Sequence, residues 1–360
     1  MMNKICWRIL AILLLWSKTF DEAQGRISKR IRFEKIGKSH KSLVPEKCKY
    51  DHALVAGDKI WIFGRRFVNQ ETSDLPHSVA YVGTYAIAFN TAKNKWEDAK
   101  SFSALSNDQN LDEKFFIHNG APHVLLYKTS NEISLEALYK WTGTKFESVR
   151  LQPFNSIVAS DSEFPVNGDL QIADSQDDNT KYIITTLDNQ MRVARLKFSG
   201  NGAKAEHLFE IPADDESEQL QATSAVASGS RLLVSYSITN YGYQWTAESI
   251  IACDLNSQSC ETLEINSISK PRWSFNGARA HALLPSGSWI HAAGQIKRGK
   301  SGGAFDGSVW ELNNLKSSPK WKKLKVKLPK MEEDEEVVID PAHKTIYCIG
   351  NTQIGKVKIA

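Results

Sequence analysis

The sequence predicts an all-β fold, and three observations lead to this prediction. Helical periodicity is scarce once the first 25 residues are passed. Short alternating or apolar runs, bounded by Gly, Asn, Asp and Ser, recur along the rest of the chain. The 360 residues include 10 Trp, 10 Tyr and 15 Phe, and aromatic residues favour strands.

The N-terminus has the pattern of a secretory signal peptide. Lys4 and Arg8 precede an apolar run from Ile9 to Trp16, and Ala23-Gln24-Gly25 places small residues where a signal peptidase cleaves. The apolar run is too short to span a bilayer. We therefore expect residues 1–25 to be removed and the protein to be secreted. A short membrane anchor or a buried helix is the alternative.

Composition and charge limit the classes of partner. Hydrophobic residues make up 41% and charged residues 24%, which is typical of a globular protein. The formal net charge of +4 is small for this length, so a nucleic-acid partner is not expected. No linker rich in Pro, Ser or Gly divides the chain, so we expect one domain over residues 26–360, acting as a monomer. Two separate domains are the alternative.

Four cysteines remain after the signal peptide, and in a secreted chain an even number predicts disulfides. Three pairings are possible. Cys253 and Cys260 bracket a turn-rich segment between two strand-like runs, so they are expected to bond across a hairpin. Cys48 and Cys348 are then expected to join the two ends of the mature chain. A zinc site is the alternative, but the sequence has no C-x2-C pair.

One unit recurs along the chain: an apolar strand, a turn, and a second strand that opens with a basic or polar residue and an aromatic one. The repeated position falls at residues 33, 96, 146, 208, 260 and 321, with spacings of 63, 50, 62, 52 and 61. Repeats of this length are typical of propeller blades, each a four-stranded sheet. The sequence thus predicts a six-bladed β-propeller, with blade segments at about 52–103, 114–152, 167–211, 221–265, 276–329 and 335–360.

The order of strands in each unit resembles the kelch repeat. In that family a hydrophobic run ends in a Gly doublet, and a Tyr precedes a Trp by about seven positions. Phe89 to Trp96 and Tyr139 to Phe146 keep this spacing, and so do Cys253 and Cys260. The doublet is reduced to Phe63-Gly64, Ala293-Gly294 and Ile349-Gly350. The resemblance covers nearly the whole mature chain and implies a propeller that acts as an interaction scaffold, by analogy with the family.

The two ends of the chain are expected to complete one sheet. The C-terminal segment supplies at most three strands of a sixth blade. The segment 28–37, which contains Ile31 to Ile36, reads as an outermost strand with no blade of its own. Pairing it with the C-terminal blade closes the ring and covers an open sheet edge.

Long connections between the second and third strands of three blades are the candidate binding surface. They run from Arg65 to Thr84, from Thr239 to Thr246 and from Gln295 to Gly307, and long loops in compact domains are often functional. Aromatic side chains beside cations suit a protein or glycan partner. The candidate binding residues are Arg65, Arg66, His77, Tyr81, Tyr241, Tyr243, Trp245, Lys297, Arg298 and Lys300.

Other chemistries have weaker support in the sequence. Acidic runs at 214–216 and 332–336 are candidates for calcium but lack regular ligand spacing. Lysines between Lys320 and Lys330 fall on an expected outermost strand, where they discourage aggregation or bind polyanions. Copper radical oxidases are another kelch-like branch, but they need a cross-linked Cys–Tyr and two His. Both Cys pairs are expected to form disulfides, and His118, His123, His281 and His291 are expected to be turn or core residues.

The sequence therefore favours a secreted, non-enzymatic protein that binds an extracellular protein or glycan through its loops, with no catalytic residue, cofactor or metal assigned. The alternative is a lactonase-like, metal-dependent hydrolase with its site in the central channel. The candidate ligands for that metal are Asn119, Asn167, Asp169 and Asn276.

Overall fold

The structure is a computed structural model, and its described residues lie between Phe33 and Ala360. The predicted signal peptide lies outside the described residues. No helix in the described part of the chain is long and apolar enough to cross a membrane. The structure describes residues 33–40, 43, 48–72, 75–103, 105, 111–129, 132–152, 157–158, 169–175, 177, 179–187, 190–212, 218–240, 249–263, 265, 271, 278–296, 304–315, 319–329, 335–350 and 352–359.

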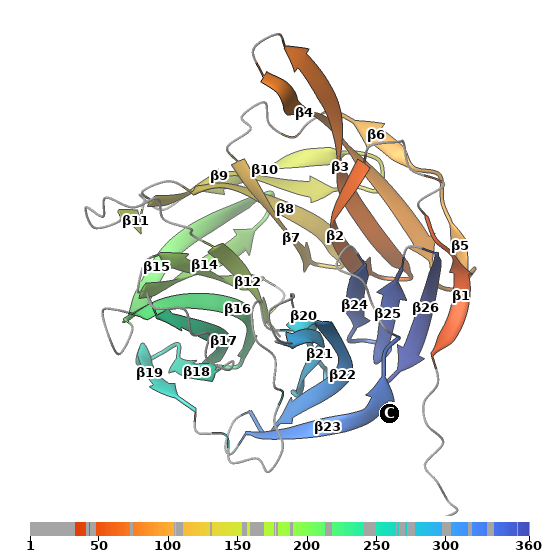
Figure 1. Cartoon of the computed structure of the whole chain (residues 1–360). Helices are drawn as coiled ribbons and strands as arrows, with labels where there is room; N and C mark the ends of the chain where they lie inside the picture. The colour runs from red at the N-terminus through yellow and green to blue at the C-terminus, as the bar shows by residue number, and fades with distance from the viewer. Residues whose placement is uncertain are drawn as a thin grey trace, which may run out of the picture. The chain divides into compact units, whose positions relative to one another are not determined.

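Every regular element described is a β-strand, which confirms the predicted fold class (Figure 1). The first sheet along the chain is antiparallel, with four strands in chain order and β6 paired to β4. Its strands are β2 (Cys48–Ala56), β3 (Lys59–Thr72), β4 (Leu75–Asn90), β5 (Lys95–Trp96) and β6 (Lys100–Phe102).

The middle of the chain forms three antiparallel groups that join edge to edge into one 13-stranded sheet. Two parallel pairings make the joins, β10 with β15 and β12 with β16. The first group is β7 (Leu111–His118), β8 (Ala121–Thr129), β9 (Glu132–Trp141) and β10 (Phe146–Gln152), with β11 (Ile157–Val158) paired to β9. The second is β12 (Asp169–Ser175), β13 (Thr180–Leu187), β14 (Gln190–Ser199) and β15 (Gly202–Pro212). The third is β16 (Glu218–Ser228), β17 (Arg231–Asn240), β18 (Ser249–Asp254) and β19 (Ser259–Thr262).

The last two sheets each contain four strands, and the final one joins the two ends of the described chain. The first of them is β20 (Ala278–Leu283), β21 (Trp289–Ile296), β22 (Ala304–Asn313) and β23 (Lys320–Lys327). The final sheet has β24 (Glu336–Asp340), β25 (Thr345–Ile349), β26 (Gln353–Lys358) and β1 (Glu34–Lys38).

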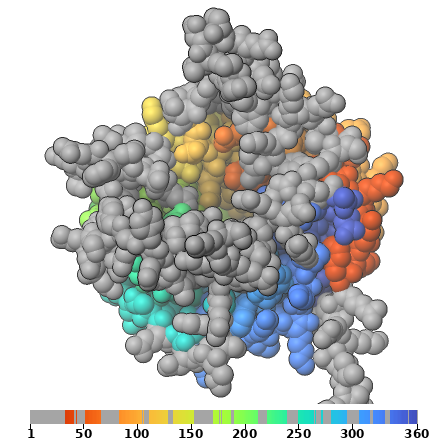
Figure 2. All heavy atoms as spheres, viewed as in Figure 1, coloured from red at the N-terminus to blue at the C-terminus, as the bar shows by residue number. Residues whose placement is uncertain are grey.

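The pairing of β1 with β26 is the one the sequence predicts for the two ends of the chain. The strands are antiparallel, with Glu34 opposite Lys356 and Lys38 opposite Gln353. Figure 2 shows the same contact on the surface, where the red residues of β1 lie against the blue C-terminal strands. An edge of the C-terminal sheet is therefore covered by a strand from the other end of the chain.

The first strands of these antiparallel groups are neighbours of one another. β2 lies next to β7 and β24, and β24 lies next to β20. β20 is followed by β16, β16 pairs with β12, and β12 lies next to β7. This order returns to its starting strand, so these six strands surround a common centre.

Hydrophobic clusters fill the space between neighbouring sheets. The most aromatic cluster joins β3 to β7, β9 and β10. Phe63 is fully buried in it, with its ring centroid 4.9 Å from Phe115, 5.6 Å from Trp141 and 5.4 Å from Phe146. Aromatic pairs at these distances add to the stabilisation from burial, so the cluster holds two sheets together.

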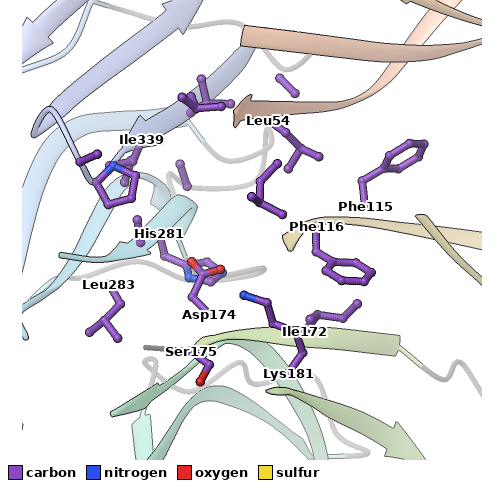
Figure 3. A pocket seen from close by; sticks show the side chains of 18 of the residues that line it. Leu54, Phe115, Phe116, Ile172, Asp174, Ser175, Lys181, His281, Leu283 and Ile339 are labelled. Atoms are coloured by element: carbon purple, nitrogen blue, oxygen red, sulfur yellow. The ribbon is translucent and has the colours of Figure 1, made fainter. Parts of the chain in front are cut away.

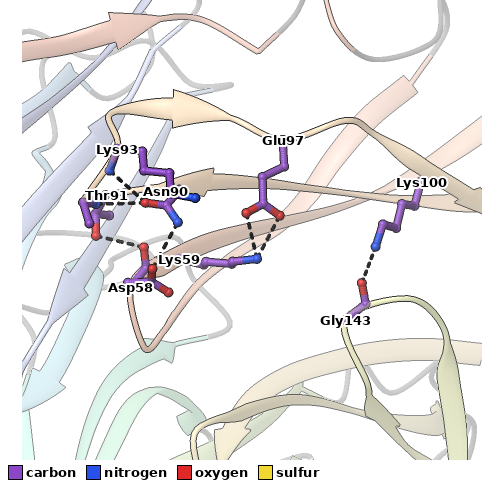
Figure 4. A network of polar contacts seen from close by, with 9 residues as sticks. Asp58, Lys59, Asn90, Thr91, Lys93, Glu97, Lys100 and Gly143 are labelled. Carbon is purple, nitrogen blue, oxygen red and sulfur yellow. Dashed lines mark hydrogen bonds and ion pairs between the residues drawn. The ribbon is translucent and has the colours of Figure 1, made fainter.

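Polar contacts at the turns fix the same two sheets (Figure 4). Gly57 has a φ of 61°, which suits the tight turn between β2 and β3. Next to it, Asn90 Nδ2 donates to Asp58 Oδ2 over 3.0 Å. Lys59 pairs with Glu97 at 2.7 Å, and Lys100 Nζ donates to the Gly143 carbonyl of the neighbouring sheet.

Two of the three pairs of residues spaced seven apart face each other across a hairpin. Phe89 lies opposite Trp96, with ring centroids 5.0 Å apart, and Cys253 lies opposite Cys260. Tyr139 instead lies opposite Ser148, and Phe146 faces Trp141. In this hairpin the register of β9 and β10 places the aromatic pair next to the turn.

The disulfide between Cys253 and Cys260 is confirmed, with Cα atoms 4.0 Å apart across β18 and β19. The second predicted bridge is not formed at Cys348, which is a buried free thiol. It lies in the middle strand β25, opposite Val337 and Gly355 in the flanking strands. Burial raises the pKa of this thiol to about 12. The side chain of Cys48 lies outside the described residues.

We expect the double variant Cys253→Ala/Cys260→Ala to lose about 2 kcal/mol of unfolding free energy, because the bridge restricts a short loop in the unfolded chain. Urea titrations with and without a reducing agent measure the loss. The reducing agent should lower the midpoint of the parent protein and leave that of the double variant unchanged. Equal parent midpoints under both conditions would contradict a stabilising role.

The prediction of a long loop between Arg65 and Thr84 is wrong. These two residues face each other in a pairing of β3 with β4 that continues as far as Thr72 opposite Leu75. The segment is rich in Phe, Val, Tyr and Thr, residues that favour strands. The second and third strands of this sheet are therefore longer than predicted, and the expected loop is a two-stranded ribbon.

Candidate ligand-binding site

A cavity of about 810 Å³ lies at the centre that the first strands of the antiparallel groups surround. Its volume falls within the range of small-molecule sites. Strands β2, β7, β12, β16, β20 and β24 all contribute to its wall. Apolar parts of the wall include Leu54, Phe115, Ile172, Leu283 and Ile339 (Figure 3).

Asp174 and Lys181 are two of the charged side chains that line this cavity. Figure 3 shows both pointing into it, from β12 and β13. The register of these strands sets Ala173 opposite Tyr182, so the next position brings Asp174 opposite Lys181. Lys181 is 7% exposed. In the described part of the chain neither side chain makes a hydrogen bond or an ion pair, and buried polar groups without partners are costly.

Lys114 approaches the same strand from the other side. It belongs to β7, and its Nζ donates to Gln171 Oε1 over 2.9 Å. Its charge reaches neighbouring histidines, since Lys114 contributes to the lowered pKa of both His52 and His281. Lys114 therefore reaches β12 from β7, while Lys181 belongs to β13, the strand paired with β12.

His281 lines the cavity from β20 as a neutral imidazole. Burial lowers its pKa, the charge of Asp174 opposes this change, and Lys114 adds to it. Trp289 Nε1 donates to His281 Nδ1 over 3.5 Å, which leaves the ring proton on Nε2. The site thus combines two cations, one carboxylate and a neutral imidazole whose Nε2 carries the ring proton.

Most of the predicted binding residues cannot be compared with this site. The side chain of Arg65 is described, and its Nε pairs with Glu113 Oε2 at 3.4 Å. Arg66, His77 and Tyr81 fall on the β3–β4 ribbon, but their side chains lie outside the described residues. The remaining predicted residues are also outside the description: Tyr241, Tyr243, Trp245, Lys297, Arg298 and Lys300.

The structure describes only some of the residues that the sequence offers as metal ligands. Asn119 lines the cavity at the turn after β7. Asp169 begins β12, but its side chain is not described, and Asn167 and Asn276 lie outside the description. Within the described residues no group of three or more His, Cys, Asp or Glu side chains has an arrangement for holding a metal ion.

The expected basic strand and buried histidines are found. β23 is the edge strand of its sheet, and its five lysines, Lys320, Lys322, Lys323, Lys325 and Lys327, are exposed. His118, His123 and His291 are buried, as predicted for core residues. Lys330 lies outside the described residues.

Comparisons with known proteins identify the fold and no family. No protein-family model matches the sequence, and no curated protein matches it. The chain is similar to the GH93 α-L-arabinofuranosidase of Fusarium graminearum, solved with arabinobiose, with a TM-score of 0.52 and 9% identity over 90% of this chain and 96% of that one. It also resembles the Dos1 propeller, with a TM-score of 0.42 and 9% identity over 86% and 78% of the two chains. For the Nup133 β-propeller domain of Vanderwaltozyma polyspora the TM-score is 0.39, with 11% identity over 87% and 100%. The chain therefore has a β-propeller fold.

The residues that define the cavity are missing from the predicted binding set. Lys114, Asp174 and Lys181 are single charged residues inside or next to apolar strands, and no short motif contains them. Their position at the first strand of a unit, or next to it, is the one signal that the sequence offers. That signal can be used only once the order of the strands in the fold is known.

Proposed function

We propose that the chain is a secreted, six-bladed propeller of the kelch-like kind. Each antiparallel group supplies one blade, in the segments 52–103, 114–152, 167–211, 221–265, 276–329 and 335–360, and β1 completes the last. The circular order of the first strands supports this count. The N-terminal signal pattern and the disulfide between Cys253 and Cys260 support an oxidising destination.

Its proposed role is to bind an extracellular glycan in the central cavity, without catalysis. The observation that carries this role is the pair Asp174 and Lys181, both directed into a cavity and both without hydrogen-bond partners among the described residues. Saccharides offer hydroxyl groups to such side chains and apolar ring faces to apolar walls such as Leu54. Pockets that combine apolar walls with a few polar groups are typical ligand sites.

The loop residues predicted from the sequence have a second, separate role in this proposal. Tyr241, Tyr243, Trp245 and Arg298, with the other predicted binding residues, are proposed to contact a protein partner or the outer part of a longer glycan. Exposed aromatic and Arg side chains carry much of the energy in such contacts. The protein is proposed to act as a monomer.

A glycan array probed with the purified protein tests the proposal, followed by calorimetric titration of each saccharide that binds. We expect Asp174→Asn to weaken binding at least about 10-fold, because a carboxylate accepts stronger hydrogen bonds than an amide. Lys325→Met is the matched control, since Lys325 is exposed on β23 far along the chain from the cavity residues. An array without any bound saccharide overturns the proposal. Full binding by Asp174→Asn overturns the cavity as its site.

A further inference from the structure

The cavity wall has an excess of positive charge. Its described charged side chains are Lys114, Lys181 and Asp174, and His281 is neutral because burial lowers its pKa. One carboxylate therefore stands against two ammonium groups. A bound neutral molecule adds no negative charge to this wall, whereas an anionic one does.

The two ammonium groups come from two different strands near β12. β12 carries Gln171 and Asp174, and its neighbours are β7 with Lys114 and β13 with Lys181. Gln171 Oε1 holds Lys114 Nζ at 2.9 Å, which fixes that cation at the β12 edge of the wall. Hydrogen bonds from these ammonium groups to an anionic ligand are charge-assisted and stronger than those to a neutral ligand.

Asp174 limits the amount of negative charge that the site accepts. It lies three residues along the same strand from Gln171, next to His281, whose pKa it influences. Its carboxylate accepts hydrogen bonds from ligand hydroxyls and repels a second anionic group. His281 Nε2 adds a neutral donor on the same side.

We infer that the cavity selects a saccharide unit that carries a single anionic group, and this inference rests on the proposed function of glycan binding. The anionic group lies between Lys114 and Lys181, and the ring hydroxyls lie toward Asp174 and His281. A neutral sugar of the same shape binds less tightly because it offers the buried Lys181 a hydroxyl group in place of an anionic partner. A site built for one polar group strongly disfavours the analogue that lacks it.

The test compares two disaccharides that differ only in one C6 carbon, a carboxylate in the uronate and a hydroxymethyl group in the neutral sugar. Calorimetric titration of the purified protein should give at least about 10-fold tighter binding for the uronate. Lys181→Met and Lys114→Met should each reduce this preference toward equality while keeping most of the affinity for the neutral sugar. Lys181→Gln repeats the test with a polar side chain, and the melting temperature of each variant reports its folding.

The outcomes separate the inference from the proposed function. Equal affinity for the two disaccharides overturns the inference and leaves glycan binding intact. Absence of binding to both disaccharides and to every array glycan overturns the proposed function. A preference that persists in both lysine variants also overturns the inference. A sulfated analogue that binds as tightly as the uronate supports the single anionic group and shows that a carboxylate is not specifically required.

Discussion

Replacement of Phe63 by alanine is expected to lower the free energy of unfolding by about 3–5 kcal/mol, one of the two largest effects we expect. Phe63 is 0% exposed, and its ring contacts those of Phe115, Trp141 and Phe146 from the neighbouring sheet. Truncation removes this contact area and leaves a cavity between two sheets. Urea denaturation followed by intrinsic fluorescence measures the change.

Two further variants keep this expectation testable if Phe63→Ala does not fold. Phe63→Leu retains much of the buried volume and should cost less than about 1.5 kcal/mol. Leu43→Ala is the control at an exposed hydrophobic residue, 48% accessible, and should change stability little. A loss below about 1 kcal/mol in a folded Phe63→Ala protein would contradict the packing between these sheets.

The second large effect is a loss of stability in mild acid. Burial lowers the pKa of His123 to about 4, and burial with the charges of Lys114 and Arg65 lowers that of His52 to about 3. His291 is also lowered well below its usual value by burial. Below the unfolded pKa of about 6.5 the unfolded chain binds protons that the folded chain refuses. Stability is therefore greatest above this pH and falls from there toward the folded pKa values.

For His123 alone the expected loss between pH 7 and pH 5 is about 2 kcal/mol, and His52 and His291 add to it. Unfolding free energies from urea titrations at the two pH values measure the total. His123→Gln removes one buried imidazole and should shrink the difference by about 2 kcal/mol. His207→Gln, at an exposed position, controls for the loss of a histidine. If the loss of stability between pH 7 and pH 5 is the same in His123→Gln and His207→Gln, His123 does not resist protonation in the folded protein.

Much of the fold follows from local patterns in the sequence. The apolar runs at Lys59–Gly64 and Ser308–Leu312 lie in β3 and β22, and Cys253 and Cys260 face each other across a hairpin. The pairing of the two chain ends was also predictable, because a lone strand and an unfinished sheet need each other. These features depend on residues close in sequence or on the count of strands.

Other features depend on long-range register, which local patterns do not contain. The position of Phe146 opposite Trp141 is set by the turn and by packing against Phe63. The free thiol of Cys348 follows from its place in a central strand. The convergence of Lys114, Asp174 and Lys181 is possible only because strands far apart in sequence surround one cavity. No motif in the sequence marks these three residues as a group.

A crystal structure of the protein with the saccharide that binds most tightly tests the central claim most directly. We expect the ligand inside the cavity, with a hydroxyl within hydrogen-bond distance of the Asp174 carboxylate and its anionic group near the amines of Lys181 and Lys114. A ligand held only by the loop residues Tyr241 and Trp245, with side chains or water alone in the cavity, would contradict it.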